Sequence, residues 1–392
     1  MLVVGCWLLV VGCWLFDYDD NIAIKKNEIM KNLIVFLFLC IAPLIAYSQN
    51  KVQVDAIYGQ LIEHDKKLAA AIDGNISGMF ITWNTTRSKN EAFNQHYNSP
   101  EKGFSLLYEN LNSNVLGKAY SAYRHYSFFL NKRNNQNKFK LITGAGLAYI
   151  TRPYDVVDNP NNHAIGSHIL LAGFAKLDYL RHQLIGNWGV QVGLGLYHYS
   201  NSAFNNPNLG LNTIAVHAGI NYNFEEKTVK TPSTFDAIPP FQKQPIYYNL
   251  VFRGGVNESK IINSGLYSFY TLTAYASKQI NWFSTITAGT DLIYSNFIPR
   301  YANYQNKHEG ENLVTNNRFR LGIFAGHELQ LDSFGMITQI GYYAYNPTHY
   351  ITNIYERIGF RHQINNHIFT ALTLRVNLFR AEALEFGLGI RF

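Results

Sequence analysis

EALEFGLGIRF, residues 382–392, alternates strictly between large apolar side chains and others. The large apolar positions are Leu384, Phe386, Leu388, Ile390 and Phe392. The positions between them hold Ala383, Glu385, Gly387, Gly389 and Arg391. Because successive side chains of a strand point to opposite faces, this period of two predicts a β-strand with one apolar face.

The same alternation recurs in residues 368–377 and 318–328, where arginine, asparagine and glycine occupy the second face. A soluble β-sandwich would show this pattern too, so the pattern alone does not place the strands in a membrane. Three further features favour a transmembrane barrel. Strands of about ten residues can cross a bilayer when tilted, and the polar face suits a lumen. Phe392 closes an alternating strand, which is similar to the terminal signature of outer-membrane barrels.

We therefore predict an all-β fold, a transmembrane antiparallel outer-membrane β-barrel of about sixteen strands within a range of twelve to sixteen. The predicted strands start near residues 53, 76, 102, 115, 138, 166, 184, 212, 246, 267, 282, 315, 334, 353, 367 and 382. Residues 225–244 are polar and contain several prolines. They form either a long periplasmic connection inside one barrel or a linker between two smaller barrels.

The N-terminal region predicts a leader that is removed. Residues 1–29 contain the tandem repeat LVVGCWL and are interpreted as a start codon assigned too far upstream. Residues 30–48 have the basic start, short apolar run and small-residue cleavage site of a secretory signal peptide. All three cysteines precede residue 49, so the mature chain would hold no disulfide, no reactive thiolate and no Cys₄ zinc site. The predicted location is the bacterial outer membrane.

The composition argues against several other classes of protein. Only 15% of the residues are charged, which is low for a soluble domain, and 15% are aromatic. No stretch after residue 49 is apolar for eighteen residues, so the sequence predicts no transmembrane helix. The formal net charge is +7, but the basic residues are scattered, so no nucleic-acid partner is predicted. An attraction for anionic lipopolysaccharide is consistent with this charge.

The stretch HYSNSAFNNPNLGLN, residues 198–212, places polar side chains on a face that otherwise carries leucines. In the strand that ends at Ser200, His198 and Ser200 share a face with Leu194 and Leu196. On the return strand, the same parity puts Asn212 on the outer face. Cross-strand neighbours lie about 5 Å apart, so we expect the three polar residues to form one patch. Counted from a periplasmic N-terminus, the seventh strand runs outward, which places this patch in the outer leaflet.

A serine beside a histidine in a lipid environment has a clear chemical use. The imidazole accepts the hydroxyl proton, the alkoxide attacks an ester, and a third polar group fixes the imidazole tautomer. Amide groups of Asn201 and Asn208 are available for an oxyanion, and Gly210 allows close backbone approach. The alternative is that His198 and Ser200 are ordinary interfacial residues before a loop that turns at an NPN sequence.

The motif His198-Tyr199-Ser200-Asn201, followed by residues 207–212 (PNLGLN), resembles the outer-membrane lipid A deacylases, the PagL-like acyloxyacyl hydrolases. The wider segment 96–224 resembles the long, Bacteroidetes-type members. The resemblance implies a β-barrel with a Ser-His-Glu triad on its outer surface, which removes ester-linked acyl chains from lipid A.

Carried over residue by residue, the resemblance makes Ser200 the nucleophile and His198 the base. It places Asn201 and Asn208 at oxyanion positions. Asn212 stands where the best-known members have the acidic residue, and Asp155 or Asp158 are possible substitutes for that acid.

The sequence thus predicts a serine esterase that deacylates lipid A, with no cofactor and no metal. The predicted domains are a deacylase-like barrel half, 49–224, and C-terminal barrel strands, 245–392. Two alternatives stay open: a barrel that binds lipopolysaccharide without hydrolysing it, and a porin-like barrel. His217 is expected to be a lone hydrogen-bonding residue in the lumen. His64, His163 and His168 lack the ligand spacing of a zinc site.

Overall fold

The computed structural model describes residues 51–85, 91–131, 136–224, 241–309, 315–331, 334–378 and 380–392. The predicted upstream segment 1–29 and signal peptide 30–48 lie outside the described residues, as does most of the connection 225–244. None of the described helices is long and apolar enough to span a bilayer.

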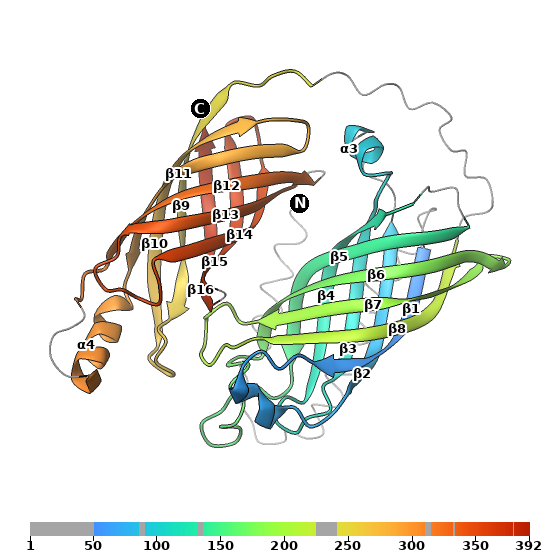
Figure 1. Ribbon diagram of the computed structural model, residues 1–392, viewed down its shortest axis with the longest axis horizontal. Coiled ribbons are helices and arrows are strands. Elements are labelled where there is room, and N and C mark those ends of the chain that lie inside the picture. Colours follow the sequence, from blue (N-terminus) through green and yellow to red (C-terminus); the bar gives the residue numbers. More distant parts are fainter. Residues whose placement is uncertain are drawn as a thin grey trace, which may run out of the picture. The chain divides into compact units, whose positions relative to one another are not determined.

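The first eight strands close into a barrel of their own (Figure 1, blue to green). They are β1 (Lys51–Leu61), β2 (Ile76–Thr85), β3 (Glu101–Asn110), β4 (Lys118–Phe129), β5 (Asn137–Ile150), β6 (Ile169–Ile185), β7 (Trp188–Ser200) and β8 (Leu211–Asn223). All neighbours are antiparallel, and β1 pairs with β8 to complete the ring. A 3₁₀ turn, η2 (Lys66–Ala71), follows β1, and a short helix, α3 (Glu91–His96), lies between β2 and β3.

The last eight strands form a second closed barrel. They are β9 (Ile246–Glu258), β10 (Leu266–Gln279), β11 (Ser284–Ser295), β12 (Phe319–Leu331), β13 (Phe334–Tyr345), β14 (Ile354–Gln363), β15 (Ile368–Asn377) and β16 (Arg380–Arg391). Pairing of β16 with β9 closes this ring. Helix α4 (Ile298–Glu309) lies in the connection between β11 and β12.

This architecture confirms the predicted all-β fold and the strand number of sixteen in the described part of the chain. It also decides the alternative that the sequence left open, because there are two barrels and not one. Residues 51–223 are a complete barrel rather than half of a larger one. The physical reason is that the edge of β1 is paired with β8 along eleven residues, so no edge remains for further strands.

Side chains fill both barrels, as expected for rings of eight strands. In the first barrel, Phe80, Tyr123, Phe174 and Tyr197 pack against one another inside the ring. In the second barrel the interior is held by buried ion pairs. The pairs are Arg357–Asp291, Arg357–Glu385, Arg375–Glu382, Arg375–Glu385 and Arg320–Glu382.

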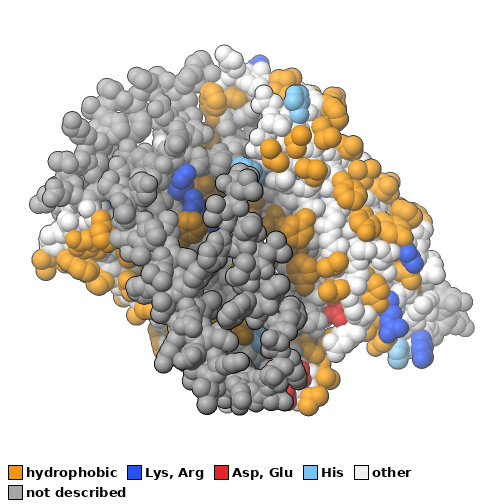
Figure 2. Space-filling model, turned by 180° about the vertical axis from the view of Figure 1, so that it is seen from behind, with side chains coloured by type: hydrophobic (Ala, Val, Ile, Leu, Met, Phe, Trp, Pro, Cys, Tyr) orange, Lys and Arg blue, Asp and Glu red, His pale blue; other side chains and the backbone are white. Residues whose placement is uncertain are grey.

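The outer surface of the strands is apolar. On β7 the outward-facing Leu194 and Leu196 are 54% and 51% exposed, whereas Gln191 on the inner face is 3% exposed. Figure 2 shows hydrophobic side chains spread over the outside of the strands on the face that it draws. An apolar exterior around an interior that holds buried charged and polar side chains beside its aromatic rings is the pattern of a barrel in lipid. The strands thereby bring the end of β7 and the start of β8 to a lipid-facing surface.

Candidate active site

The predicted site lies where β7 and β8 are joined by the loop 201–210. His198 is exposed on the outer face, in line with Leu194 and Leu196. In the ladder between the two strands, His198 pairs with Asn212. The apolar outer surface therefore ends in a polar pair at this end of the hairpin, as the parity of the two strands predicts.

A hydrogen bond joins the side chains of this pair. The Nδ1 atom of His198 lies 2.7 Å from Oδ1 of Asn212. An amide oxygen only accepts, so the imidazole proton belongs on Nδ1. Nε2 of His198 then carries a lone pair, which is the state that a general base needs.

The amide group of Asn212 has a second partner, His64, in the segment between β1 and η2. Nδ2 of Asn212 lies 3.3 Å from Nδ1 of His64, and Nε2 of His64 lies 3.0 Å from the carbonyl oxygen of Leu209. The carbonyl of Ile62 is 3.2 Å from the same Nδ1 atom. The sequence predicts no role for His64, because the pairing of β1 with β8 is what brings it to Asn212.

Ser200 is held by the loop and is 7% exposed. Its Oγ atom lies 3.1 Å from Nδ2 and 3.3 Å from Oδ1 of Asn208, and it accepts the backbone N–H of Ser202 at 3.2 Å. Asn208 also accepts the backbone N–H of Asn201 at 3.1 Å. Within the described residues, no hydrogen bond joins Ser200 to His198.

The structure thus forms two separate pairs, His198 with Asn212 and Ser200 with Asn208. His198 and Ser200 are two residues apart on one strand, so they share a face. In unliganded enzymes, hydrogen bonds of a catalytic group are often long or misaligned. Rotation of the Ser200 side chain away from Asn208 is the change that proton transfer to His198 would require.

Gly210 and Asn201 shape the loop. Gly210 has φ +77°, and its N–H donates to the carbonyl of Ala164 at 3.0 Å. A Cβ atom built there would lie 3.4 Å from Cε1 of His198, so the backbone passes directly against the imidazole. The side chain of Asn201 is 1% exposed and donates to the carbonyl of Asn205. Among the described residues, its Oδ1 atom has no hydrogen-bond partner.

The carboxylate of Asp155 belongs to its own loop. It accepts the N–H groups of Asp158 at 2.9 Å and Val157 at 2.8 Å. These bonds favour the charged form and hold the pKa of Asp155 below its usual range. The contact that orients His198 comes from Asn212, and within the described residues neither Asp155 nor Asp158 supplies it.

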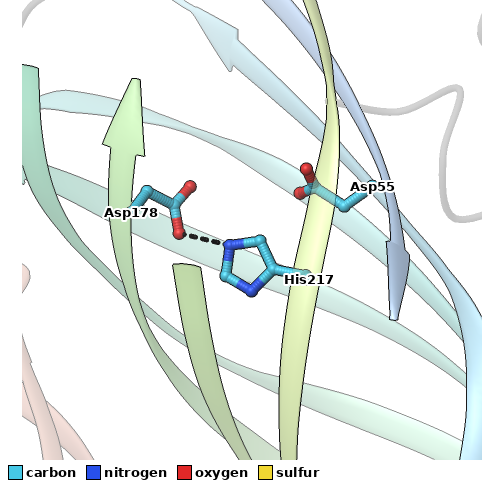
Figure 3. Close-up of side chains that lie close together, drawn as sticks. All are labelled: Asp55, Asp178 and His217. Atoms are coloured by element: carbon cyan, nitrogen blue, oxygen red, sulfur yellow. Dashed lines mark hydrogen bonds and ion pairs between the residues drawn. The ribbon is translucent and has the colours of Figure 1, made fainter. Parts of the chain in front are cut away.

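A second polar cluster lies inside the first barrel. Asp55, Asp178 and His217 are buried, and one ligand atom of each lies within 4.8 Å of the others. Figure 3 shows His217 directed at Asp178, with Nε2 and Oδ1 2.9 Å apart. The ammonium group of Lys176 lies 2.6 Å from Asp55 and 3.7 Å from Asp178.

Lys176 already supplies the positive charge that a metal ion would bring, so this cluster is a buried ion-pair network. The prediction that His217 is a hydrogen-bonding residue of the lumen is confirmed. It is not alone, however, because Asp178 on β6 is its partner. Sequence spacing did not reveal this contact, since the two residues come from strands that are not neighbours in the ladder.

Two family models match the chain. Residues 77–221 match lipid A 3-O-deacylase (PagL), and residues 246–392 match the C-terminal domain of acyloxyacyl hydrolase. The first match spans β2 to β8 of the first barrel, and the second spans β9 to β16. Together they span well over half of the 392 residues. The comparison with curated proteins gave no match.

Solved structures with some similarity include CdiB from Acinetobacter baumannii, at 10% identity, with 88% of this chain and 60% of CdiB covered and a TM-score of 0.17. A mutant of the Rh. blastica porin is 9% identical, with 88% and 100% covered and a TM-score of 0.17. A deletion mutant of TodX, a monoaromatic hydrocarbon channel, is 8% identical, with 88% and 90% covered and a TM-score of 0.16. TM-scores this low carry no argument about fold or function.

Proposed function

Because this chain belongs to the acyloxyacyl hydrolase family, whose members include the lipid A 3-O-deacylases, we propose that it is an outer-membrane serine esterase that removes ester-linked acyl chains from lipid A. The observation that carries the proposal is the hydrogen bond between His198 and Asn212 on an apolar outer face, two residues from Ser200. Such a pair is costly in lipid unless it serves chemistry.

The position of the pair along the barrel supports a lipid substrate. The apolar outer rows of β7 and β8 end at His198 and Asn212. Exposed tyrosines lie near the same ends of the other strands; they are Tyr58, Tyr120 and Tyr149. Tyrosines gather where the acyl region meets the headgroups. The acyl esters of lipid A lie at this boundary, between the sugars and the chains.

In the proposed reaction, Nε2 of His198 takes the proton of Ser200 as Oγ bonds to the ester carbonyl carbon. The tetrahedral oxyanion collapses, the sugar oxygen leaves with the proton from His198, and an acyl-serine remains. Water then attacks with His198 again as base, and free fatty acid and Ser200 are released. Asn208, with its amide group at Oγ, and Asn201 are proposed to bind the oxyanion.

A barrel that binds lipopolysaccharide without hydrolysing it is the second candidate. Two observations favour it: Asn212 carries no charge to stabilise the imidazolium, and Ser200 is bonded to Asn208 rather than to His198. The porin-like alternative is disfavoured, because buried aromatic rings and ion pairs occupy the two interiors.

The test is release of fatty acid from lipid A by the full chain in detergent micelles, with mass spectrometry of the lipid product. Wild type is expected to release fatty acid, and Ser200→Ala and His198→Ala to lower the rate at least about a hundredfold. His168→Ala is the matched control, since within the described residues the side chain of this exposed histidine bonds to the Ile150 carbonyl and stacks on Tyr149, away from Ser200 and its partners. Lipid binding with no release by wild type would support the second candidate instead.

A further inference from the structure

The structure points to a role for a residue outside the family motif. We propose that His64 is a positioning residue, which fixes the orientation of the Asn212 amide and, through it, the tautomer of His198. The effect of this residue on catalysis rests on the proposed esterase function. Its positioning role is argued from the contacts among these three side chains alone.

An asparagine in the acid position creates an ambiguity that a carboxylate does not. Both oxygens of a carboxylate accept, so either one orients a histidine N–H. An amide presents an acceptor on one side and a donor on the other. If Asn212 turned its NH₂ group to His198, Nδ1 would have to accept, and the proton would move to Nε2. His198 could then no longer take a proton from Ser200.

His64 removes this ambiguity, because its own protonation is set by a third group. Both ring nitrogens of His64 face a carbonyl oxygen, Nε2 that of Leu209 at 3.0 Å and Nδ1 that of Ile62 at 3.2 Å. With the proton on Nε2 the neutral ring makes two hydrogen bonds, one to Leu209 and one from Asn212, whereas with the proton on Nδ1 it makes only the bond to Ile62. In the form with two bonds, Nδ1 is an acceptor, and it takes the N–H of Asn212 at 3.3 Å. The oxygen of Asn212 is thereby directed to His198 at 2.7 Å.

The backbone holds this arrangement in place. The N–H of Ile62 donates to the carbonyl of Asn212 at 2.8 Å, which ties the segment carrying His64 to the first residues of β8. Leu209 lies beside Asn208, so the same contact joins His64 to the loop that holds Ser200. The hydrogen bonds therefore run from Asn212 to His64 and from His64 to Leu209 of the loop.

Glutamine is the replacement that distinguishes this role from simple packing. Its amide offers an N–H to Leu209 and an oxygen to Asn212, whereas alanine offers neither. The second discriminating change is Asn212→Asp. A carboxylate at residue 212 accepts from His198 in either orientation and no longer needs His64 to direct it. Glu63→Ala is the matched control, because Glu63 is the exposed neighbour of His64.

The first experiment measures kcat and KM for fatty-acid release from lipid A. His64→Ala is expected to lower kcat about tenfold with KM unchanged, and His64→Gln to stay within about twofold of wild type. In the Asn212→Asp background, His64→Ala is expected to have less than about a twofold effect. Equal losses in both backgrounds, or a loss for glutamine as large as for alanine, would overturn the proposal.

The second experiment does not depend on activity. Nitrogen NMR of ¹⁵N-histidine-labelled protein, at a pH where the rings are neutral, reports the tautomer of His198, assigned by loss of its signal in His198→Ala. Wild type and His64→Gln are expected to show the Nδ1–H form, and His64→Ala a mixture. An unchanged tautomer in His64→Ala rejects the positioning role, even if wild type proves inactive. Lack of fatty-acid release with the expected NMR result rejects only the esterase proposal.

Discussion

At the scale of single residues, the proposed function makes Asn212 the residue that sets how strongly His198 acts as a base. Its oxygen bonds to Nδ1 of His198 at 2.7 Å and so selects the correct tautomer. It carries no charge, however, so it stabilises the imidazolium formed in the reaction less than a carboxylate would. The pair of His198 and Asn212 has the orientation that the proposed reaction needs, with a weaker electrostatic contribution from Asn212.

Asn212→Asp should therefore raise activity. Aspartate has nearly the shape of asparagine, so it preserves the contact to His198 while adding a negative charge. We expect kcat for fatty-acid release to rise about three- to tenfold, and Asn212→Leu to lower it at least about tenfold. A sharp loss in Asn212→Asp would show that residue 212 does not hold the acid position.

The backbone of Gly210 lies against the imidazole of His198. Its φ is +77°, and an added Cβ would lie 3.1 Å from the carbonyl oxygen of Tyr199 and 3.4 Å from Cε1 of His198. Gly210→Ala should lower stability by about 1–2 kcal/mol and also lower fatty-acid release, because the imidazole must shift.

The control for this prediction is Gly186, which has φ +59° but open space around the position of a Cβ. Gly186→Ala should cost a similar conformational strain and leave activity unchanged. Thermal unfolding and fatty-acid release measured on both variants separate strain from the steric effect on His198. Equal activity of the two variants would mean that the backbone at residue 210 does not constrain the imidazole.

At the scale of elements, Glu109 of β3 ties together the two strands that carry the site. It is fully buried inside the first barrel and accepts hydrogen bonds from the hydroxyl groups of Tyr199 and Thr213, the latter at 3.1 Å. Tyr199 lies between His198 and Ser200, and Thr213 follows Asn212. The interior of the barrel thus fixes the ends of β7 and β8 from the side opposite the site.

Glu109→Leu should destabilise the barrel by about 1–3 kcal/mol, because it leaves two buried hydroxyl groups without an acceptor. Glu109→Gln keeps an acceptor and should cost less. Tyr199→Phe in the Glu109→Leu background should recover part of the loss by removing one unsatisfied hydroxyl. Denaturant unfolding in micelles measures all three effects. No recovery in the double variant would show that the loss in Glu109→Leu does not come from an unsatisfied Tyr199 hydroxyl.

The elements also show what sequence could and could not predict. The period of two in β7 and β8 was sufficient to place His198 beside Asn212, because parity and a hairpin determine which residues share a face. The partners of Ser200 come from the loop, whose conformation has no period to follow. His64 was missed because its contact depends on closure of β1 onto β8, which are distant in sequence. One barrel of sixteen strands and two barrels of eight would show the same alternation in sequence, because the alternation does not say which strands pair to close a ring.

At the scale of the whole molecule, packed side chains occupy both interiors, and truncating one of them is expected to lower the free energy of unfolding. Arg357 in the second barrel pairs with Asp291 at 2.9 Å and Glu385 at 2.7 Å, and all three are buried. Removing one partner of such a network leaves charges without compensation, which is strongly destabilising. We therefore expect the interiors to act as structural cores rather than as pores.

We accordingly expect no ion conductance from the full chain reconstituted in planar bilayers. Discrete conductance steps in wild type, absent from protein-free bilayers, would favour the porin-like alternative.

Arg357→Ala is expected to unfold the second barrel at lower denaturant concentration, with a loss of about 3–5 kcal/mol in the free energy of unfolding. Preserved stability in this variant would show that the ion pairs do not hold the interior.

The proposed function requires His198 at the outer end of β7 to activate Ser200, which is buried against the loop 201–210. The most direct measurement is labelling with an alkyl fluorophosphonate, in which Ser200 Oγ bonds to phosphorus, fluoride leaves and His198 takes the proton, followed by mass spectrometry of the labelled peptide. We expect an adduct on Ser200 in wild type and at least about a hundredfold slower labelling in His198→Ala. No adduct on Ser200, or equal labelling rates in both proteins, would contradict it.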